Sequence, residues 1–160
     1  IESGYLTRYS FRMATLIENK KVWMKYEPLA EFEAGLVLLG TEVKALRARQ
    51  GSLLGARVVV RGGDAWLLGA TIPAYQVQNA PPGYDPERPR QLLVKKDEAW
   101  TLSEAEAKGG LTIIPVEVYN KGKNLKLRVA VVRGKRKADR REDLKRREAE
   151  REAARVLKQR

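Results

Sequence analysis

The sequence predicts a mainly β protein that has a few short helices and ends in a basic tail. Two stretches, residues 56–72 and 111–132, have the pattern of β-hairpins, because runs rich in β-branched residues flank turns that contain glycine. Residues 133–160 are rich in Lys, Arg, Glu and Ala, and they hold too few apolar side chains to pack a core. These observations separate a β body from a charged appendage.

The hairpins provide most of the predicted strands. Residues 56–72 run from a β-branched strand through Gly62, Gly63 and Asp64 into a second apolar strand. In the returning strand of residues 111–132, apolar residues alternate with Lys126 and Arg128. One face of this strand is therefore predicted to be core and the other to be basic.

Helical patterns are scarcer. Residues 41–49 and 97–108 predict two short helices, the second of which ends at a pair of glycines. The segment 79–90 contains too many prolines for regular structure, so it is predicted to be a loop that carries Arg88 and Arg90. Hairpins, short flanking helices and a small closed size together predict an OB-type Greek-key barrel, which is a common platform for RNA.

The positive charge is unevenly distributed along the chain. The 160 residues have a net charge of +12, and residues 133–160 account for +7 of it through 13 Lys/Arg against 6 Asp/Glu. We expect a body over residues 13–132 and a tail that is disordered when free and helical when bound. Residues 1–12 are expected to be a non-native or flexible extension. A tail that only improves solubility fits the composition as well, although the dense cations between Arg133 and Arg141 favour a polyanion.

Several classes of function are excluded by composition. The chain has no cysteine and no histidine, so disulfides, thiol nucleophiles, Cys/His zinc sites and imidazole bases are absent. Glu31 and Glu33 flank Phe32 as surface acids on a strand, and Asp85 belongs to a turn, so neither forms a catalytic or metal-binding constellation. We therefore expect no enzyme, cofactor, metal or small-molecule substrate.

The sequence shows no targeting signal for a location other than the cytoplasm. No run approaches the roughly 18 apolar residues of a membrane span, and the start lacks the pattern of a secretory signal. We therefore expect a cytoplasmic protein without a membrane partner.

Basic pairs are the candidate RNA contacts. They are Lys20 with Lys21, Lys44 with Arg47, Arg88 with Arg90, and Lys126 with Arg128. Lys and Arg neutralise phosphates, but these pairs form one surface only if the fold brings them together. Aromatic residues at polar or loop positions are candidates for base stacking, although packing is the commoner role of such side chains: Trp23, Tyr26, Tyr75, Tyr84 and Tyr119.

Several blocks of the sequence closely resemble the SmpB family of SsrA-binding proteins, with nearly constant spacing from about residue 18 to about residue 147. The blocks are Asn19-Lys20-Lys21, Phe32-Glu33-Ala34-Gly35-Leu36, Gly40-Thr41-Glu42-Val43-Lys44-Ala45-Leu46-Arg47, Asp85-Pro86-x-Arg88-x-Arg90-x-Leu92-Leu93, and Gly134-Lys135-Arg136-x-x-Asp139-Arg140-Arg141. The resemblance implies an OB-type barrel that binds the tRNA-like domain of tmRNA. It also implies delivery of tmRNA to stalled bacterial ribosomes, where the tail enters the decoding centre and the mRNA channel beside small-subunit RNA.

The resemblance assigns expected roles to individual positions. It implies that Asn19, Glu33, Leu93 and Lys126 bind tmRNA, with polar groups on ribose or base edges and Leu93 against a base. The residues of the tail expected to contact the ribosome are Lys135, Arg136, Lys137, Asp139, Arg140, Arg141 and Lys145. Ala138 departs from the family, which often carries a ring there. An alternative function is a general OB-fold nucleic-acid chaperone whose tail binds without specificity.

Overall fold

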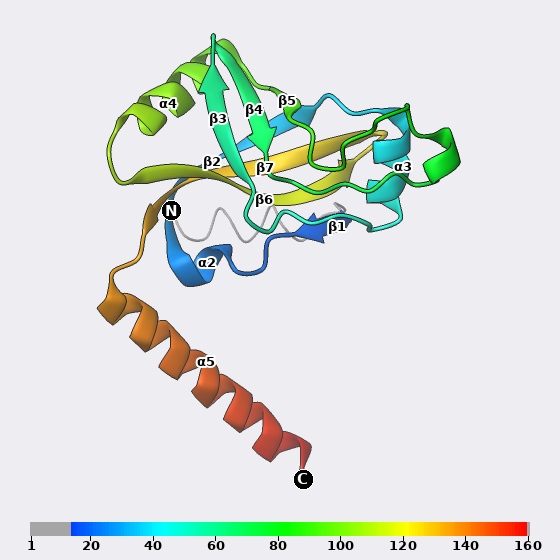
Figure 1. The fold of residues 1–160 in the computed structure, drawn as a ribbon. Coiled ribbons are helices and arrows are strands. Elements are labelled where there is room, and N and C mark those ends of the chain that lie inside the picture. The colour runs from blue at the N-terminus through cyan, green and yellow to red at the C-terminus, as the bar shows by residue number, and fades with distance from the viewer. Residues whose placement is uncertain (1–13, 160) are drawn as a thin grey trace.

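Seven antiparallel strands form one sheet in the computed structural model, which describes residues 14–159 (Figure 1). The strands are β1 (Thr15–Glu18), β2 (Tyr26–Leu36), β3 (Arg57–Arg61), β4 (Asp64–Leu68), β5 (Arg90–Leu93), β6 (Leu111–Lys121) and β7 (Asn124–Gly134). Their order in the sheet is β1-β6-β7-β2-β5-β4-β3. The predicted mainly β class is confirmed. The extension predicted for residues 1–12 lies outside the described residues.

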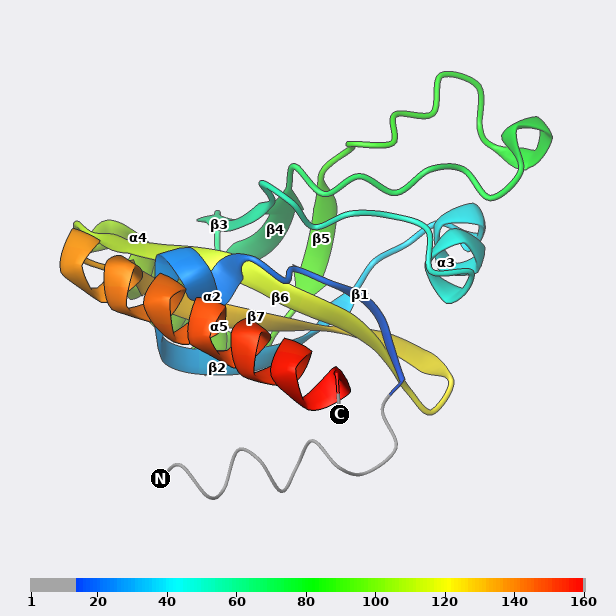
Figure 2. The ribbon, with the colours of Figure 1, turned by 90° about the horizontal axis from the view of Figure 1, so that it is seen from below.

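The helices flank the sheet. They are α2 (Val22–Lys25), α3 (Gly40–Arg47), α4 (Lys96–Ala107) and α5 (Lys137–Lys158), with a 3-10 turn η1 (Val77–Asn79). Helices α3 and α4 confirm the two helices predicted over residues 41–49 and 97–108. Figure 2 shows α2 beside β6 and α3 at the far end of the sheet, near β1. In the described part of the chain, no helix combines the length and apolar character needed to cross a membrane.

Both predicted hairpins are confirmed. β3 pairs with β4 from Arg57 opposite Leu68 to Arg61 opposite Asp64. The two turn residues, Gly62 and Gly63, have φ of 61° and 83°, the positive values that a tight hairpin turn requires and that glycine adopts without strain.

The strands are arranged as a Greek key that curls into a barrel. The chain runs from β2 through α3 into β3, β4 and β5, which are neighbours in the sheet. β5 then lies beside β2. Edge strand β3 also contacts β6, with no hydrogen-bonded ladder between the two among residues 14–159. The result is a partly open barrel, as expected for the OB type.

Two apolar clusters hold the structure together. The larger one fills the barrel with aliphatic side chains from every strand, together with Leu46 of α3 and Leu102 of α4. The smaller one lies on the outer face, where Val22 of α2 packs on β6 and β7. The partly buried rings of Trp23 and Tyr26 pack against this second cluster, so α2 is attached to the sheet by apolar contacts.

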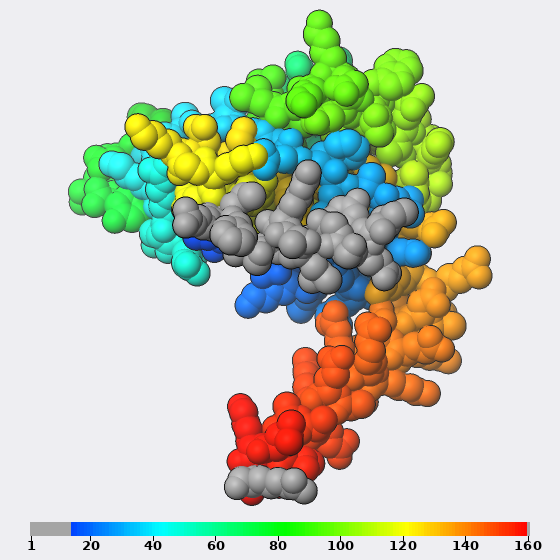
Figure 3. All heavy atoms as spheres, turned by 180° about the vertical axis from the view of Figure 1, so that it is seen from behind, coloured from blue at the N-terminus to red at the C-terminus, as the bar shows by residue number. Residues whose placement is uncertain are grey.

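The tail is a helix that buries no side chain. Strand β7 continues to Gly134, two residues beyond the expected end of the body at residue 132, and α5 follows at Lys137. Figure 3 shows that only the first turns of α5 lie near the body, while the remainder projects away from it. That the tail is disordered when free and helical when bound remains a prediction.

Candidate nucleic-acid interface

A surface hollow lies where β2, β5 and β7 meet. In the ladders, Gly35 of β2 is opposite Leu93 of β5 on one side and Lys126 of β7 on the other. Glu33, two residues earlier on β2, lies on the same face because side chains alternate along a strand. This hollow of about 440 Å³, the Leu93 hollow, is lined by Glu33, Gly35, Leu93, Val94, Lys95, Glu98 and Lys126. The structure thus brings together three of the four positions that the resemblance assigns to tmRNA.

Glu33 is held as an oriented carboxylate. The Tyr119 hydroxyl donates to Oε2, and Lys121 Nζ donates to Oε1 at 2.9 Å. Partial burial raises the pKa of Glu33, but the hydrogen bonds from Lys121 and Tyr119 and the charges of Lys121 and Lys126 outweigh it, so the pKa lies below 4.5. Tyr119 is buried and its pKa is raised, chiefly by desolvation. It therefore fixes Glu33 rather than stacking on a base.

Leu93 projects from the hollow with 57% of its surface exposed. An apolar side chain that is this exposed on a short, well-packed strand is available to cover a base. Gly35 makes room for it, because a Cβ added at Gly35 would lie 3.2 Å from Leu93 Cβ. The glycine therefore sets the position of the leucine beside Lys126.

Arg128 differs from Lys126 although both lie on the same face of β7. Its guanidinium pairs with Glu117 and lies 3.6 Å from Glu31. Burial lowers the pKa of Arg128 to about 10, and burial also raises the pKa of Glu31. The expectation that this face is basic is therefore wrong around Arg128, where acids from β2 and β6 match the charge.

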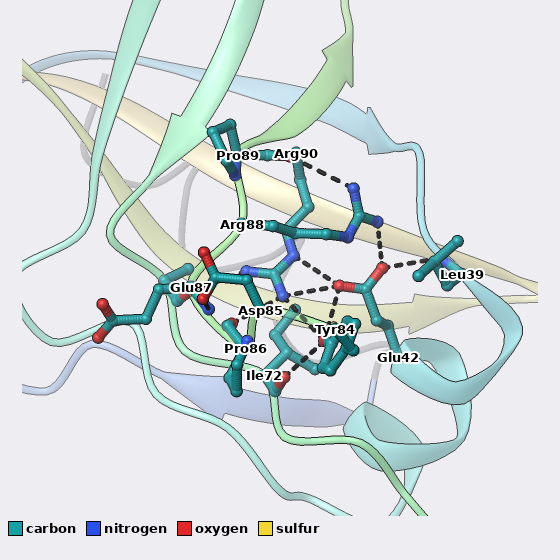
Figure 4. A network of polar contacts seen from close by, with 11 residues as sticks. Leu39, Glu42, Ile72, Tyr84, Asp85, Pro86, Glu87, Arg88, Pro89 and Arg90 are labelled. Carbon is teal, nitrogen blue, oxygen red and sulfur yellow. Dashed lines mark hydrogen bonds and ion pairs between the residues drawn. The ribbon is translucent and has the colours of Figure 1, made fainter. Parts of the chain in front are cut away.

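A network of buried charges fixes the proline-rich loop (Figure 4). Glu42 of α3 and Arg90 of β5 are both completely buried, and Arg90 Nε donates to Glu42 Oε2 at 2.7 Å. Arg90 also donates to the carbonyls of Ala70 at 2.7 Å and Pro86 at 2.8 Å. These bonds tie the start of β5 to the end of β4 and to the loop.

Other groups complete the network around Glu42. Arg88 pairs with Oε1, the Leu39 N–H donates to the same oxygen at 2.8 Å, and the Tyr84 hydroxyl lies 3.1 Å from Oε2. Burial acts to raise the pKa of Glu42, but donors from Arg88, Leu39 and Arg90 lower it below 4.5. Glu42 therefore stays ionised, as a buried arginine requires.

This network bears on three expectations. Arg90 was expected to bind RNA, but it has no exposed surface and its donors are taken by the protein, so it is a structural residue. Arg88 is partly buried and paired with Glu42, which leaves it little freedom to reach a phosphate. Tyr84, a candidate for base stacking, donates to the carbonyl of Ile72 at 2.7 Å and belongs to the same network.

The basic pair on α3 lies apart from the Leu93 hollow. Lys44 and Arg47 are exposed on α3, where Arg47 Nη2 donates to the Lys123 carbonyl at 3.0 Å. Arg47 therefore contacts the β6–β7 turn, at one end of the barrel.

Asn19 lies in a second hollow. Its side chain donates to the carbonyls of Leu53 and Pro115, both at 3.4 Å, so it links the loop at Leu53 to strand β6. This hollow of about 310 Å³, the Arg57 hollow, is lined by Asn19, Lys21, Val22, Lys25, Tyr26, Leu54, Gly55, Ala56, Arg57, Thr112 and Ile114. Lys20 is exposed beside it in the chain. The sequence does not point to Lys25 and Arg57, because the two lie far apart along the chain. They come together only in the folded protein.

Lys135 joins the tail to the body. Its backbone N–H donates to the Lys25 carbonyl at 2.9 Å, its Nζ donates to the Trp23 carbonyl at 2.7 Å, and the same Nζ pairs with Asp143 of α5. It is therefore partly buried at the joint. The other expected tail contacts, Arg136, Lys137, Asp139, Arg140, Arg141 and Lys145, are exposed. Within residues 14–159, no three His, Cys, Asp or Glu side chains come together as a metal site would require.

Comparisons with known proteins agree with this geometry. Residues 16–159 match the family model described as SmpB protein. An SsrA-binding protein of Oleidesulfovibrio alaskensis is 43% identical over 147 residues, which cover 90% of this chain and 92% of the relative. One from Thermosynechococcus vestitus is 40% identical over 145 residues, with 91% and 95% covered. A solved chain described under "tmRNA-SmpB: a journey to the center of the bacterial ribosome" matches with a TM-score of 0.64 and 33% identity, covering 82% of this chain and 95% of that one.

Proposed function

Because the chain belongs to the SmpB family of SsrA-binding proteins, we propose that it binds the tRNA-like domain of tmRNA and delivers it to stalled ribosomes. The similar solved chain, described with tmRNA and the bacterial ribosome, supports both partners. In this role the protein is an RNA-binding factor that catalyses no reaction itself and acts in the bacterial cytoplasm, where ribosomes are found. The tail is the part that enters the decoding centre and the mRNA channel.

One observation carries the assignment of the surface: Glu33, Leu93 and Lys126 converge on one hollow from three different strands. The three supply an oriented acceptor, an apolar contact and a cation. Such a set suits an exposed nucleotide, because the carboxylate accepts from ribose or base donors while the cation neutralises a phosphate. Lys95 adds a second cation at the rim.

Binding of the isolated tRNA-like domain tests this surface. Loss of one phosphate contact in Lys126→Ala should weaken binding by about tenfold, a modest effect for one charge-assisted bond. Glu33→Gln should weaken it as well, because the oriented carboxylate is lost. The matched control is Lys108→Ala, which removes an exposed lysine beyond the end of α4. Equal affinities for all three variants would reject the Leu93 hollow as the tmRNA site.

Truncation after Gly134, the last residue of β7, tests the separate roles proposed for the body in tmRNA binding and for the tail on the ribosome. We expect the truncated protein to bind the tRNA-like domain but to fail in peptide tagging on stalled ribosomes. A truncated protein that still supports tagging would remove the role proposed for the tail.

The alternative, a general nucleic-acid chaperone, is favoured only by the net charge of +12. Competition separates the two functions. If unrelated structured RNA displaced labelled tmRNA as well as unlabelled tmRNA does, the specific function would be lost.

A further inference from the structure

Helix α5 contacts the body over a short stretch near its start. All of α5 lies within the described residues, and of its side chains only Asp143 and Arg147 are partly buried, while the others are exposed. The two residues are four apart, so they lie on the same side of the helix. This part of α5 lies beside α2 in Figure 2, and the two helices are in contact. The side of α5 that carries Asp143 therefore faces the body at α2.

Helix α2 gives this contact a firm support. Val22 is buried in the apolar cluster that α2 forms with β6 and β7. The ladder between β2 and β7 ends where Tyr26 lies opposite Gly134. The next residue, Lys135, adds one more backbone bond, because its N–H donates to the Lys25 carbonyl at 2.9 Å. The backbone is therefore fixed to the body up to Lys135, two residues before α5 begins.

The side chain of Lys135 joins α2 to α5. Its Nζ donates to the Trp23 carbonyl at 2.7 Å and pairs with the carboxylate of Asp143 in the second turn of α5. The side chains of Lys135 and Asp143 are only 18% and 20% exposed. The hydrogen bond from Lys135 holds the pKa of Asp143 below its ordinary value, although desolvation opposes this effect. We call these contacts of Lys135 with Trp23, Lys25 and Asp143 the α2–α5 joint.

Asp143 differs from the other acids of the tail. Residues 133–160 hold six acids, and Asp143 is the only one of them that forms an ion pair within residues 14–159. Its second oxygen, Oδ1, lies 3.1 Å from Arg146 Nη2. Glu142, the residue before it, is exposed and has no such pair in the same range. A carboxylate repels phosphates, so contact with RNA does not explain Asp143, whereas its contact with Lys135 does.

Apolar packing contributes less to the joint. Met24 of α2 and Leu144 of α5 line a hollow of about 360 Å³ between the two helices. Leu144 remains 48% exposed, so the helices are not closely packed against each other. The polar contacts of Lys135 therefore decide how α5 lies on α2.

The direction of α5 matters because the helix is long. Its 22 residues span about 33 Å at 1.5 Å per residue. A rotation of about 20° at the joint would move the far end by roughly 11 Å, which is about the full diameter of an α-helix with its side chains. The side chains of α5 beyond Arg147 are all exposed, so nothing after the joint corrects such a rotation. The joint alone sets where the end of the tail lies relative to the body.

We propose that Lys135 and Asp143 are positioning residues that hold the start of α5 on α2 and so set the direction in which the tail leaves the body. The inference rests on the proposed function, in which the tail enters the decoding centre and the mRNA channel. Lys135 then acts inside the protein, through Asp143 and the Trp23 carbonyl, rather than as a contact to the ribosome. Because the joint reaches Arg147, the disorder predicted for the free tail begins after that residue.

The first experiment measures the rate of peptide tagging on stalled ribosomes. Asp143→Lys replaces the attraction to Lys135 by repulsion, so tagging should become about fivefold slower, the change in population expected for one partly exposed ion pair. Affinity for the tRNA-like domain should not change, because Asp143 lies outside the Leu93 hollow. The matched control, Glu142→Lys, makes the same change of charge at the neighbouring exposed residue and should tag at least as fast as the parent. Asp143→Glu keeps the charge and should retain most of the parent rate.

The outcomes separate this role from the proposed function. If Asp143→Lys tagged as fast as Glu142→Lys, the positioning role would be rejected, because only the net charge of the tail would matter. If the parent protein itself neither bound the tRNA-like domain nor supported tagging, the proposed function would fail instead.

A second measurement tests the joint without a ribosome. Because the chain has no cysteine, Lys108→Cys on the body and Glu148→Cys just beyond the joint place two thiols for spin labels at exposed positions. Double electron–electron resonance should give one narrow distribution of distances for this labelled chain. Asp143→Lys should broaden the distribution, and Glu142→Lys should not. A broad distribution without further substitution, or one that Asp143→Lys leaves unchanged, would overturn the proposal whether or not the proposed function holds.

Discussion

Two groups of cations in this protein have opposite surroundings. Arg88 and Arg90 meet Glu42 inside the barrel wall, where both Glu42 and Arg90 are completely buried. Lys25 and Arg57 line the Arg57 hollow on the surface, and neither forms an ion pair with an acid among residues 14–159. In the sequence all four are ordinary basic residues near prolines, glycines or aromatics.

The difference shows that burial and pairing decide the role of a cation. A buried arginine must be matched by a carboxylate and by acceptors for its other donors, since an unpaired buried charge is costly. Arg90 meets that requirement through Glu42, Ala70 and Pro86. A surface cation without an acid remains available for phosphates. The Glu42 network therefore stabilises the fold, and Lys25 and Arg57 keep their charges exposed at the surface.

The largest effect should follow from breaking the buried network. Glu42→Ala leaves Arg90 uncompensated in the barrel wall, and removal of one partner of a buried pair typically costs about 3–5 kcal/mol of unfolding free energy. Urea denaturation followed by circular dichroism measures the loss. The control, Arg57→Ala, should change stability by less than about 0.5 kcal/mol, as expected at an exposed site. Equal losses of unfolding free energy in the two variants would show that the buried network is no more important for stability than an exposed cation.

A pH titration of stability sharpens the same point. The pKa of Glu42 is below its ordinary value of 4.5 in the folded state. Its ionisation therefore contributes stability that is fully present above 4.5 and is lost as the pH falls through the lower folded value. Glu42→Gln cannot ionise, so the stability difference between parent and variant should be largest near neutral pH and should shrink in acid. A difference that stays constant from neutral to acidic pH would show that the charge of Glu42 contributes nothing.

The sequence predicts the elements whose cause is local. Both hairpins were predicted because alternation and the Gly62-Gly63 turn act within a few residues. Strands β1 and β5 were not, because each has four residues, too few to show a period. Their existence depends on partners far along the chain, such as β6 for β1 and β2 for β5.

The same distinction applies to the site. Glu33, Leu93 and Lys126 could be predicted from the family resemblance, but their convergence required the ladders of β2 with β5 and β7. Arg90 was misassigned because a basic residue after a proline-rich loop gives no sign of burial. Its partner Glu42 lies 48 residues earlier in the chain. Arg57 was missed because its neighbours in the Arg57 hollow come from α2 and β6.

A smaller effect should separate the two surfaces without changing stability. Leu93→Ala removes an apolar contact that is 57% exposed in the free protein, so folding should be unaffected. Burial of a leucine against RNA is worth about 1–2 kcal/mol, so affinity for the tRNA-like domain should fall roughly 5- to 30-fold. Leu54→Ala at the Arg57 hollow is the matched control, because Leu54 is also exposed and its loss should leave this affinity unchanged. If both variants lowered the affinity for the isolated tRNA-like domain equally, the two hollows would belong to one binding surface.

The smallest effect comes from a single methyl group beneath Leu93. In Gly35→Ala the new Cβ would lie 3.2 Å from Leu93 Cβ, which is closer than ordinary contact, so Leu93 must shift by a few tenths of an ångström. Affinity for the tRNA-like domain should fall about two- to fivefold, while the free energy of unfolding changes by less than about 1 kcal/mol. Gly40→Ala is the control, because an added Cβ there meets no atom within 4 Å at the start of α3. Since alanine is the better helix former, Gly40→Ala should leave stability equal or higher and binding unchanged. If Gly35→Ala bound as tightly as Gly40→Ala, the position of Leu93 would be unimportant, and the charges of Glu33 and Lys126 alone would account for the Leu93 hollow.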